Sequence, residues 1–124
     1  MRLIRFLCGP ALVYAGVMHF LRPGFYRPMM PAWLPAHDEL IFVSGVTEVV
    51  AGAALICPDR RVRRAGGVLG ILTLIGVFPA NVEMATHSDR FPNIPPAALW
   101  ARLPLQAVML AWVVAAMRPS QRSN

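Results

Sequence analysis

Six ionisable or amide side chains interrupt the long apolar stretches of this sequence. They are His19, Glu48, Asn81, Glu83, Arg102 and Gln106. An ionisable group near the middle of a bilayer costs about 2.5 kcal/mol or more, so it normally faces the interior of a helix bundle and has a partner. Together these side chains could bind a polar ligand, relay a proton or clamp neighbouring helices.

Glu83 and Arg102 are predicted to form an ion pair. Both residues fall within the first two turns from the same side of the membrane, and an arginine at that depth without a carboxylate would be costly. The pair would either contribute to a ligand site or join two helices as an architectural clamp.

Glu48 lies deeper, about ten residues or ~15 Å from the end of its apolar stretch. No arginine is expected at that depth, so two roles are open. Glu48 either contacts a ligand or is a protonated acid that hydrogen bonds to Gln106 or Asn81. His19 either relays protons or contacts a ligand, or, as is commoner for such a residue, forms an interfacial hydrogen bond.

Other chemistries have little support in the sequence. Cys8 and Cys57 could form a redox pair at one side of the membrane, but they lack a CxxC spacing, and a reducing compartment favours free buried thiols. No nucleophile elbow, P-loop, HExxH motif or metal-spaced Cys/His set occurs. We therefore predict no metal site, and at most a role as a subunit of an oxidoreductase.

The elements that must position these residues are four apolar stretches. Hydrophobic residues make up 56% of the 124 residues and charged residues only 15%, too few to coat a soluble globule. Residues 3–21, 38–57, 65–86 and 97–117 each approach the roughly 20 residues that a membrane-spanning helix needs. The sequence predicts one domain, 1–124, that is an all-α integral membrane four-helix bundle.

Arginine distribution predicts the orientation of the bundle. All twelve basic residues are Arg. Eight of them belong to the two termini and to the basic turn at 58–64, and four belong to the other side. The positive-inside rule then places both termini in the cytoplasm, which fits a bacterial inner membrane. The arginines are interpreted as topology determinants that contact lipid, and not as a nucleic-acid surface.

The loop at 22–37 is rich in proline and in aromatic residues. Its four prolines exclude a long regular helix, and Phe25, Tyr26 and Trp33 favour the headgroup level of the bilayer. The loop is interpreted either as an interfacial anchor or as a lid over a ligand cavity.

Small and polar residues form a stripe along each predicted span. The second span carries Ser44, Gly45, Glu48, Ala51 and Gly52, and the third carries Gly66, Gly70, Thr73, Gly76, Ala80, Glu83 and His87. Small residues let helices approach closely, and polar ones bond across the interface. Because the helices alternate in direction, we expect the polar groups to converge in the outer half of the bundle.

Five runs follow one another along the chain: GVMHFLRPGFY at 16–26, MPAWLP at 30–35, SGVTE at 44–48, FPANVEMA at 78–85 and WARLPLQ at 100–106. This ordered set resembles the DoxX-like family of small four-helix membrane proteins. The resemblance implies the four-helix topology and a polar site at His19, Glu48, Asn81, Arg102 and Gln106. Relatives in that family include the membrane subunit of a thiosulfate:quinone oxidoreductase, a mycobacterial membrane partner of a superoxide dismutase and a sulfurtransferase, and animal proteins that assist receptor assembly.

Three functional hypotheses follow from the resemblance and the polar groups. The first is a membrane subunit of a redox or thiol-stress system that binds a quinone or similar amphiphile, with lipid and other redox subunits as partners and a homo-oligomer left open. The second is a scaffold or assembly factor whose polar core only fixes the helices, with a GxxxG face at Gly66 and Gly70 for its partner. The third is a small proton-coupled transporter that uses Glu48, although no inverted repeat is visible.

Overall fold

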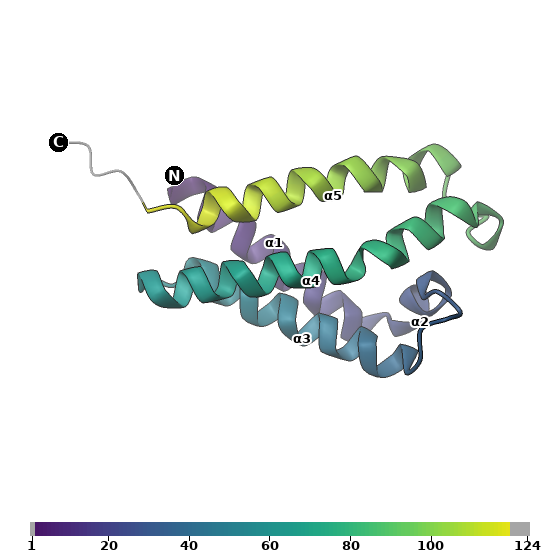
Figure 1. Cartoon of the computed structure of the whole chain (residues 1–124), viewed down its shortest axis with the longest axis horizontal. Helices are drawn as coiled ribbons and strands as arrows, with labels where there is room; N and C mark the ends of the chain where they lie inside the picture. Colours follow the sequence, from purple (N-terminus) through teal and green to yellow (C-terminus); the bar gives the residue numbers. More distant parts are fainter. Residues whose placement is uncertain (1, 120–124) are drawn as a thin grey trace.

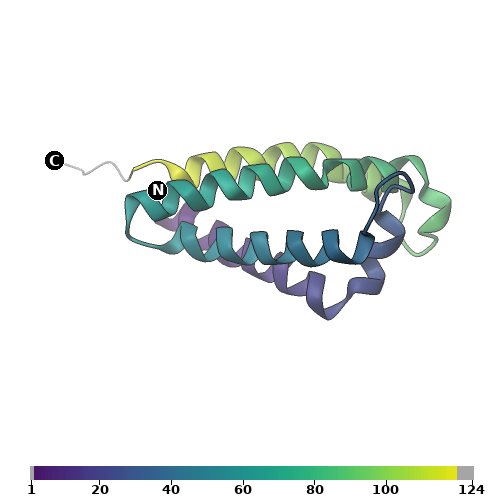
Figure 2. The same ribbon diagram turned by 60° about the horizontal axis from the view of Figure 1, so that its bottom comes forward.

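Four long antiparallel helices form an elongated bundle (Figure 1). The computed structural model describes residues 2–119. The long helices are α1 (Arg2–Leu21), α3 (His37–Ile56), α4 (Arg60–Thr86) and α5 (Pro96–Met117); the short ones are α2 (Pro23–Tyr26), η1 (Arg27–Met29) and η2 (Ser88–Arg90). The start of α1, the α3–α4 turn and the end of α5 share one end, here called the basic end; α2, η1 and η2 share the other, the loop end (Figure 2).

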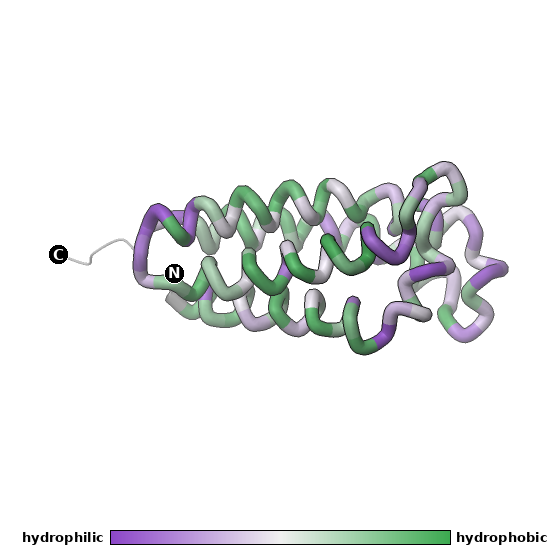
Figure 3. The backbone as a smooth tube through the Cα atoms, turned by 90° about the horizontal axis from the view of Figure 1, so that it is seen from below, coloured by the Kyte–Doolittle hydropathy of each residue, from purple (hydrophilic) through white to green (hydrophobic). Residues whose placement is uncertain are grey.

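All four long helices are long and apolar enough to cross a membrane. Polar residues gather at the two ends of the bundle, and apolar residues dominate the lengths between them (Figure 3). The predicted all-α class, with four apolar helices of membrane-spanning length, is therefore confirmed for residues 2–119, and the ends of α1, α3 and α5 lie within one residue of the limits predicted for the spans.

Helix α4 begins earlier than expected, at Arg60 and not near residue 65. The prediction of a basic turn over 58–64 is wrong, because Asp59 caps the helix by accepting hydrogen bonds from the backbone N–H groups of Arg61 (2.7 Å) and Val62 (3.1 Å). Arg63 is buried and donates from Nη1 to the carbonyls of Cys57 and Pro58, so it satisfies the end of α3.

Replacing Asp59 with alanine should destabilise the first turn of α4 by about 1 kcal/mol, since its backbone N–H groups would lose their acceptor. The four arginines of this turn are unfavourable at a helix N-terminus and increase the dependence on Asp59. Hydrogen exchange at the amides of Arg61 and Val62 should become faster. Asp89→Ala, in the exposed η2 segment, is the control and should leave those amides unchanged.

Two glycine pairs bring α1 and α3 into backbone contact along the most extensive helix interface of the bundle. A Cβ added at Gly52 would lie 2.5 Å from the carbonyl oxygen of Gly9, and one at Gly16 would lie 2.6 Å from that of Gly45. A Cβ at Gly45 would also meet His19 Cβ at 2.9 Å. The close approach of the two helices therefore places His19 next to the face of α3 that carries Glu48.

Other glycines of the predicted stripes have different surroundings. Gly66 and Gly70 are buried and face Ala54 and Ala51 of α3, so they pack within the chain and present no GxxxG face to a partner. Nothing lies within 4 Å of a Cβ at Gly76, so this residue does not belong to the packed stripe.

Two apolar clusters stabilise the halves of the bundle. The first, toward the basic end, contains Cys8, Leu12, Ala51, Leu55, Leu74, Val113 and Ala116. The second, toward the loop end, contains Met29, Met84, Phe91 and Leu99. In the basic half Trp112 Nε1 donates to the carbonyl of Ile4 (3.2 Å) and ties α5 to α1.

Candidate functional site

A cavity of about 220 Å³ lies between the four long helices in the half toward the loop end. The polar residues that line it are His19, Tyr26, Ser44, Glu48, Asn81, Arg102 and Gln106. Five of the six predicted polar residues thus share one cavity, and Glu83 is the exception. Apolar side chains such as Leu74, Val77 and Met109 form the rest of the wall.

Glu48 presents a buried carboxylate oxygen that has no hydrogen-bond partner within residues 2–119. Its side chain is 8% exposed, and Oε2 lies 3.2 Å from His19 Nδ1. That nitrogen lies closer, at 2.8 Å, to the carbonyl oxygen of Ala15, which can only accept. The Nδ1 proton is therefore directed to Ala15, and Glu48 Oε2 is left available to a ligand.

Tyr26 of α2 covers the cavity from the loop end. Its ring stacks on that of His19, with centroids 4.2 Å apart and an angle of 12° between the planes. Burial raises the pKa of the Tyr26 phenol, and the nearby Glu48 carboxylate raises it further, while Arg102 opposes the rise. Tyr26 therefore stays a neutral hydrogen-bond donor at neutral pH.

Of the three residues predicted for the lid, Tyr26 lines the cavity and the other two do not. Phe25 packs edge-on against Tyr26 but does not line the cavity, and Trp33 is 72% exposed. Met29 and Met30 line it instead. The aromatic rings are the visible signal in the sequence of this loop, whereas the short 3-10 helix turns Met29 inward.

Asn81 and Gln106 form an amide pair between α4 and α5. Asn81 Nδ2 donates to Gln106 Oε1 (2.5 Å), and Gln106 Nε2 donates to the carbonyl of Leu74 (2.6 Å). Pro79 lacks an N–H, so the carbonyl of Ile75 has no backbone donor one turn later. The Leu74 carbonyl that Gln106 binds is the one immediately before it. The alternative in which a protonated Glu48 bonds to Gln106 or Asn81 is wrong, because these amides bond to each other and to the helix backbone.

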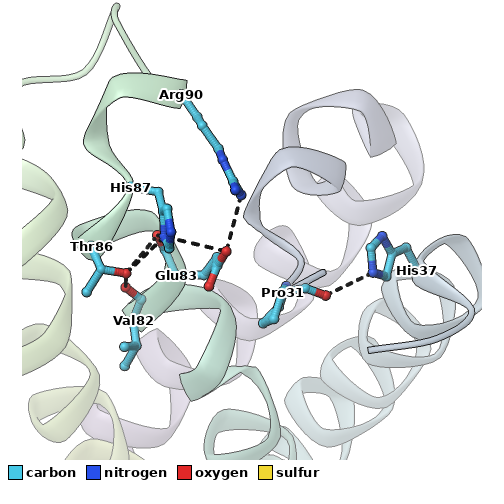
Figure 4. A network of polar contacts seen from close by, with 7 residues as sticks. All are labelled: Pro31, His37, Val82, Glu83, Thr86, His87 and Arg90. Carbon is cyan, nitrogen blue, oxygen red and sulfur yellow. Dashed lines mark hydrogen bonds and ion pairs between the residues drawn. The ribbon is translucent and has the colours of Figure 1, made fainter. Parts of the chain in front are cut away.

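Glu83 belongs to a separate network at the loop end (Figure 4). Its Oε1 accepts from Arg90 Nη1 (3.2 Å) and lies 3.5 Å from His87 Nδ1. The predicted Glu83–Arg102 pair is therefore wrong. Glu83 lies one turn from the end of α4, whereas Arg102 is about 9 Å inside α5, and η2 folds Arg90 back over Glu83.

Arg102 is left without a carboxylate. None of the salt bridges within residues 2–119 involves this residue, and it lines the cavity in a half-buried position. A guanidinium without a counter-ion beside an apolar wall is costly unless a ligand or a headgroup supplies acceptors. The cavity therefore combines a strong donor from α5 with an unpartnered carboxylate oxygen from α3.

The described part of the chain contains no cluster of side chains suited to metal binding or to thiol chemistry. Residues 2–119 contain no group of three or more His, Cys, Asp or Glu side chains that could hold a metal ion. Cys8 is buried, Cys57 is half-buried, and both are free thiols. No disulfide joins the two cysteines within these residues, so the alternative of a redox pair has no structural support.

Fold and site together define a bundle of four apolar helices of membrane-spanning length that encloses a polar cavity. The chain belongs to the family described as a domain of unknown function, DUF8561, whose sequence profile matches residues 8–117. This match includes every residue that lines the cavity. No curated protein and no solved structure is detectably similar to the chain.

Proposed function

We propose that this protein is an integral membrane protein that binds a quinone-like or lipid-like amphiphile in the cavity and acts as a membrane subunit of a redox or thiol-stress system. One observation carries the proposal. The cavity holds Glu48 Oε2, which has no hydrogen-bond partner within residues 2–119, and the Arg102 guanidinium, which forms no salt bridge there. Buried polar groups without partners are uncommon in folded proteins, and at a cavity a ligand can supply the missing partner.

The size and lining of the cavity favour a small polar head. Pockets for drug-sized ligands have volumes of roughly 300–1,000 Å³, whereas this cavity has about 220 Å³. A single ring with oxygen atoms on two sides fits such a space, because Arg102 and Tyr26 can donate to it and Glu48, when protonated, can donate from the other wall. The apolar lining suits the carbons of the ring.

The resemblance to DoxX-like proteins adds support, because one relative of that family is the membrane subunit of a thiosulfate:quinone oxidoreductase. We place the loop end outside and the basic end in the cytoplasm, in a bacterial inner membrane. The arginines of the basic end, Arg60, Arg61 and Arg64, support this orientation since they are exposed at one end of the bundle.

Replacing Glu48 with alanine should lower the affinity for a decyl-tailed benzoquinone by about tenfold, the cost of one lost hydrogen bond of about 1.4 kcal/mol. Glu48→Gln should retain most of the binding, because an amide can still donate to a ring oxygen. Titration of the purified protein in lipid nanodiscs would measure both affinities.

Glu39→Ala, an exposed acid in the first turn of the same helix, is the matched control and should bind like the wild type. Absence of saturable binding by the wild type, or unchanged binding by Glu48→Ala, would count against the proposal.

A scaffold or assembly factor is the second candidate. The observation that favours it is the amide pair of Asn81 and Gln106, in which two of the predicted site residues bond to each other and join α4 to α5. Under this alternative, Glu48 and Arg102 variants would bind the partner as the wild type does.

A further inference from the structure

The loop end of the cavity is covered by the chain itself. Tyr26 stacks on His19, and Met29, which lines the cavity, is only 5% exposed. Segment η1 contacts both α3 and α4, so it bridges these two helices above the cavity. Entry from the water at this end would require the α2–η1 segment to move.

Three of the four sides of the cavity are tied together by specific interactions. The glycine pair Gly16 and Gly45 brings the backbones of α1 and α3 into contact. Thr73 donates to Thr47 (2.9 Å) between α4 and α3. The Asn81–Gln106 bond ties α4 to α5.

Within residues 2–119, no hydrogen bond ties the fourth side, between α1 and α5, in this half. It is the smallest interface between neighbouring long helices. The bond from Trp112 to Ile4 lies in the basic half, and the two helices diverge toward the loop end (Figure 1). The α2 and η1 segments make no contact with α5 comparable to those with the other three helices.

Leu105 marks the opening. Of the described residues that line the cavity, it alone is exposed, at 56%. It lies on the same face of α5 as Arg102 and Met109, which also line the cavity. Leu105 and Met109 therefore give the α5 side of this opening an apolar surface.

We propose that the α1–α5 gap is a lateral portal through which the cavity takes its ligand from the bilayer, and through which the apolar tail of that ligand extends into the hydrocarbon. The inference rests on the proposed function and names its substrate class more narrowly. The ligand is a ring-headed amphiphile with one apolar tail, whose head contacts Arg102 and Glu48 and whose tail passes Leu105. The small cavity requires such an exit, since it has no room for a tail.

Leu105→Trp tests the portal, because an indole at this position would fill the gap from the exposed side of α5. Two probes separate the head from the tail: the decyl-tailed benzoquinone and the same ring without the tail. Leu105→Trp should slow association of the tailed probe and weaken its binding by about tenfold, and should affect the tail-less ring by less than about threefold. Leu105→Ala should bind the tailed probe at least as fast as the wild type.

Leu72→Trp is the matched control, since Leu72 is 62% exposed on α4 and does not line the cavity. Circular dichroism and the elution volume in detergent would establish that each variant is folded. Binding of the tailed probe by the wild type with equal effects of Leu105→Trp and Leu72→Trp would overturn the portal and leave the proposed function standing. Failure of the wild type to bind either probe would overturn both.

Discussion

Replacing Arg102 with methionine should weaken binding of the decyl-tailed benzoquinone by about 10- to 100-fold, because a hydrogen bond to a charged group contributes about 1.5–3 kcal/mol. The same change should leave the thermal unfolding midpoint in detergent unchanged or higher. Arg102 has no carboxylate partner within residues 2–119, so methionine removes a half-buried cation without stranding a counter-ion. Loss of binding with retained stability distinguishes a ligand site from a helix clamp.

Arg90→Met provides the matched control for this prediction. Arg90 pairs with Glu83 outside the cavity and is exposed, so its loss should change neither the affinity nor the midpoint appreciably. A lower midpoint with unchanged affinity in Arg102→Met would contradict the ligand site and favour an architectural role for this arginine.

Gly52→Ala should destabilise the bundle by about 2–3 kcal/mol, the usual cost of overpacking a tight interface. Alanine is otherwise preferred over glycine within a helix by about 1 kcal/mol, but here the added Cβ would lie 2.5 Å from a backbone oxygen of Gly9. Backbone atoms cannot turn aside as a flexible side chain can, so α1 and α3 must separate. Unfolding by denaturant in mixed micelles would measure the loss.

Gly76→Ala is the matched control, because an added Cβ meets nothing within 4 Å. It should leave stability unchanged or raise it by up to about 1 kcal/mol, since only helix propensity changes. Gly52→Ala should also weaken probe binding, because separation of α1 from α3 moves His19 away from Glu48. A gain of stability in both variants would contradict the close backbone contact.

Local properties of the sequence predicted the helices and most of the polar residues of the cavity. Apolar runs of about 20 residues suffice to predict helices of membrane-spanning length, because the length and hydropathy of a segment do not depend on the rest of the fold. His19, Glu48, Asn81, Arg102 and Gln106 line one cavity because each is a polar residue in an apolar span, and such residues must turn away from lipid. The basic composition of residues 58–64 predicts a turn, but α4 begins at Arg60. The cap that Asp59 provides outweighs the unfavourable charges of the four arginines at the helix N-terminus.

Which polar groups meet depends on the tertiary structure. Glu83 pairs with Arg90, and not with Arg102, because the path of the η2 loop and the depth of each residue set the distance between them. The glycines of α1 that contact α3 carry no polar signal, so the spacing of one helix could not reveal them without its neighbour. Periodicity specifies which way a residue faces within its own helix, whereas its partner depends on how helices distant in sequence pack and how the loops return.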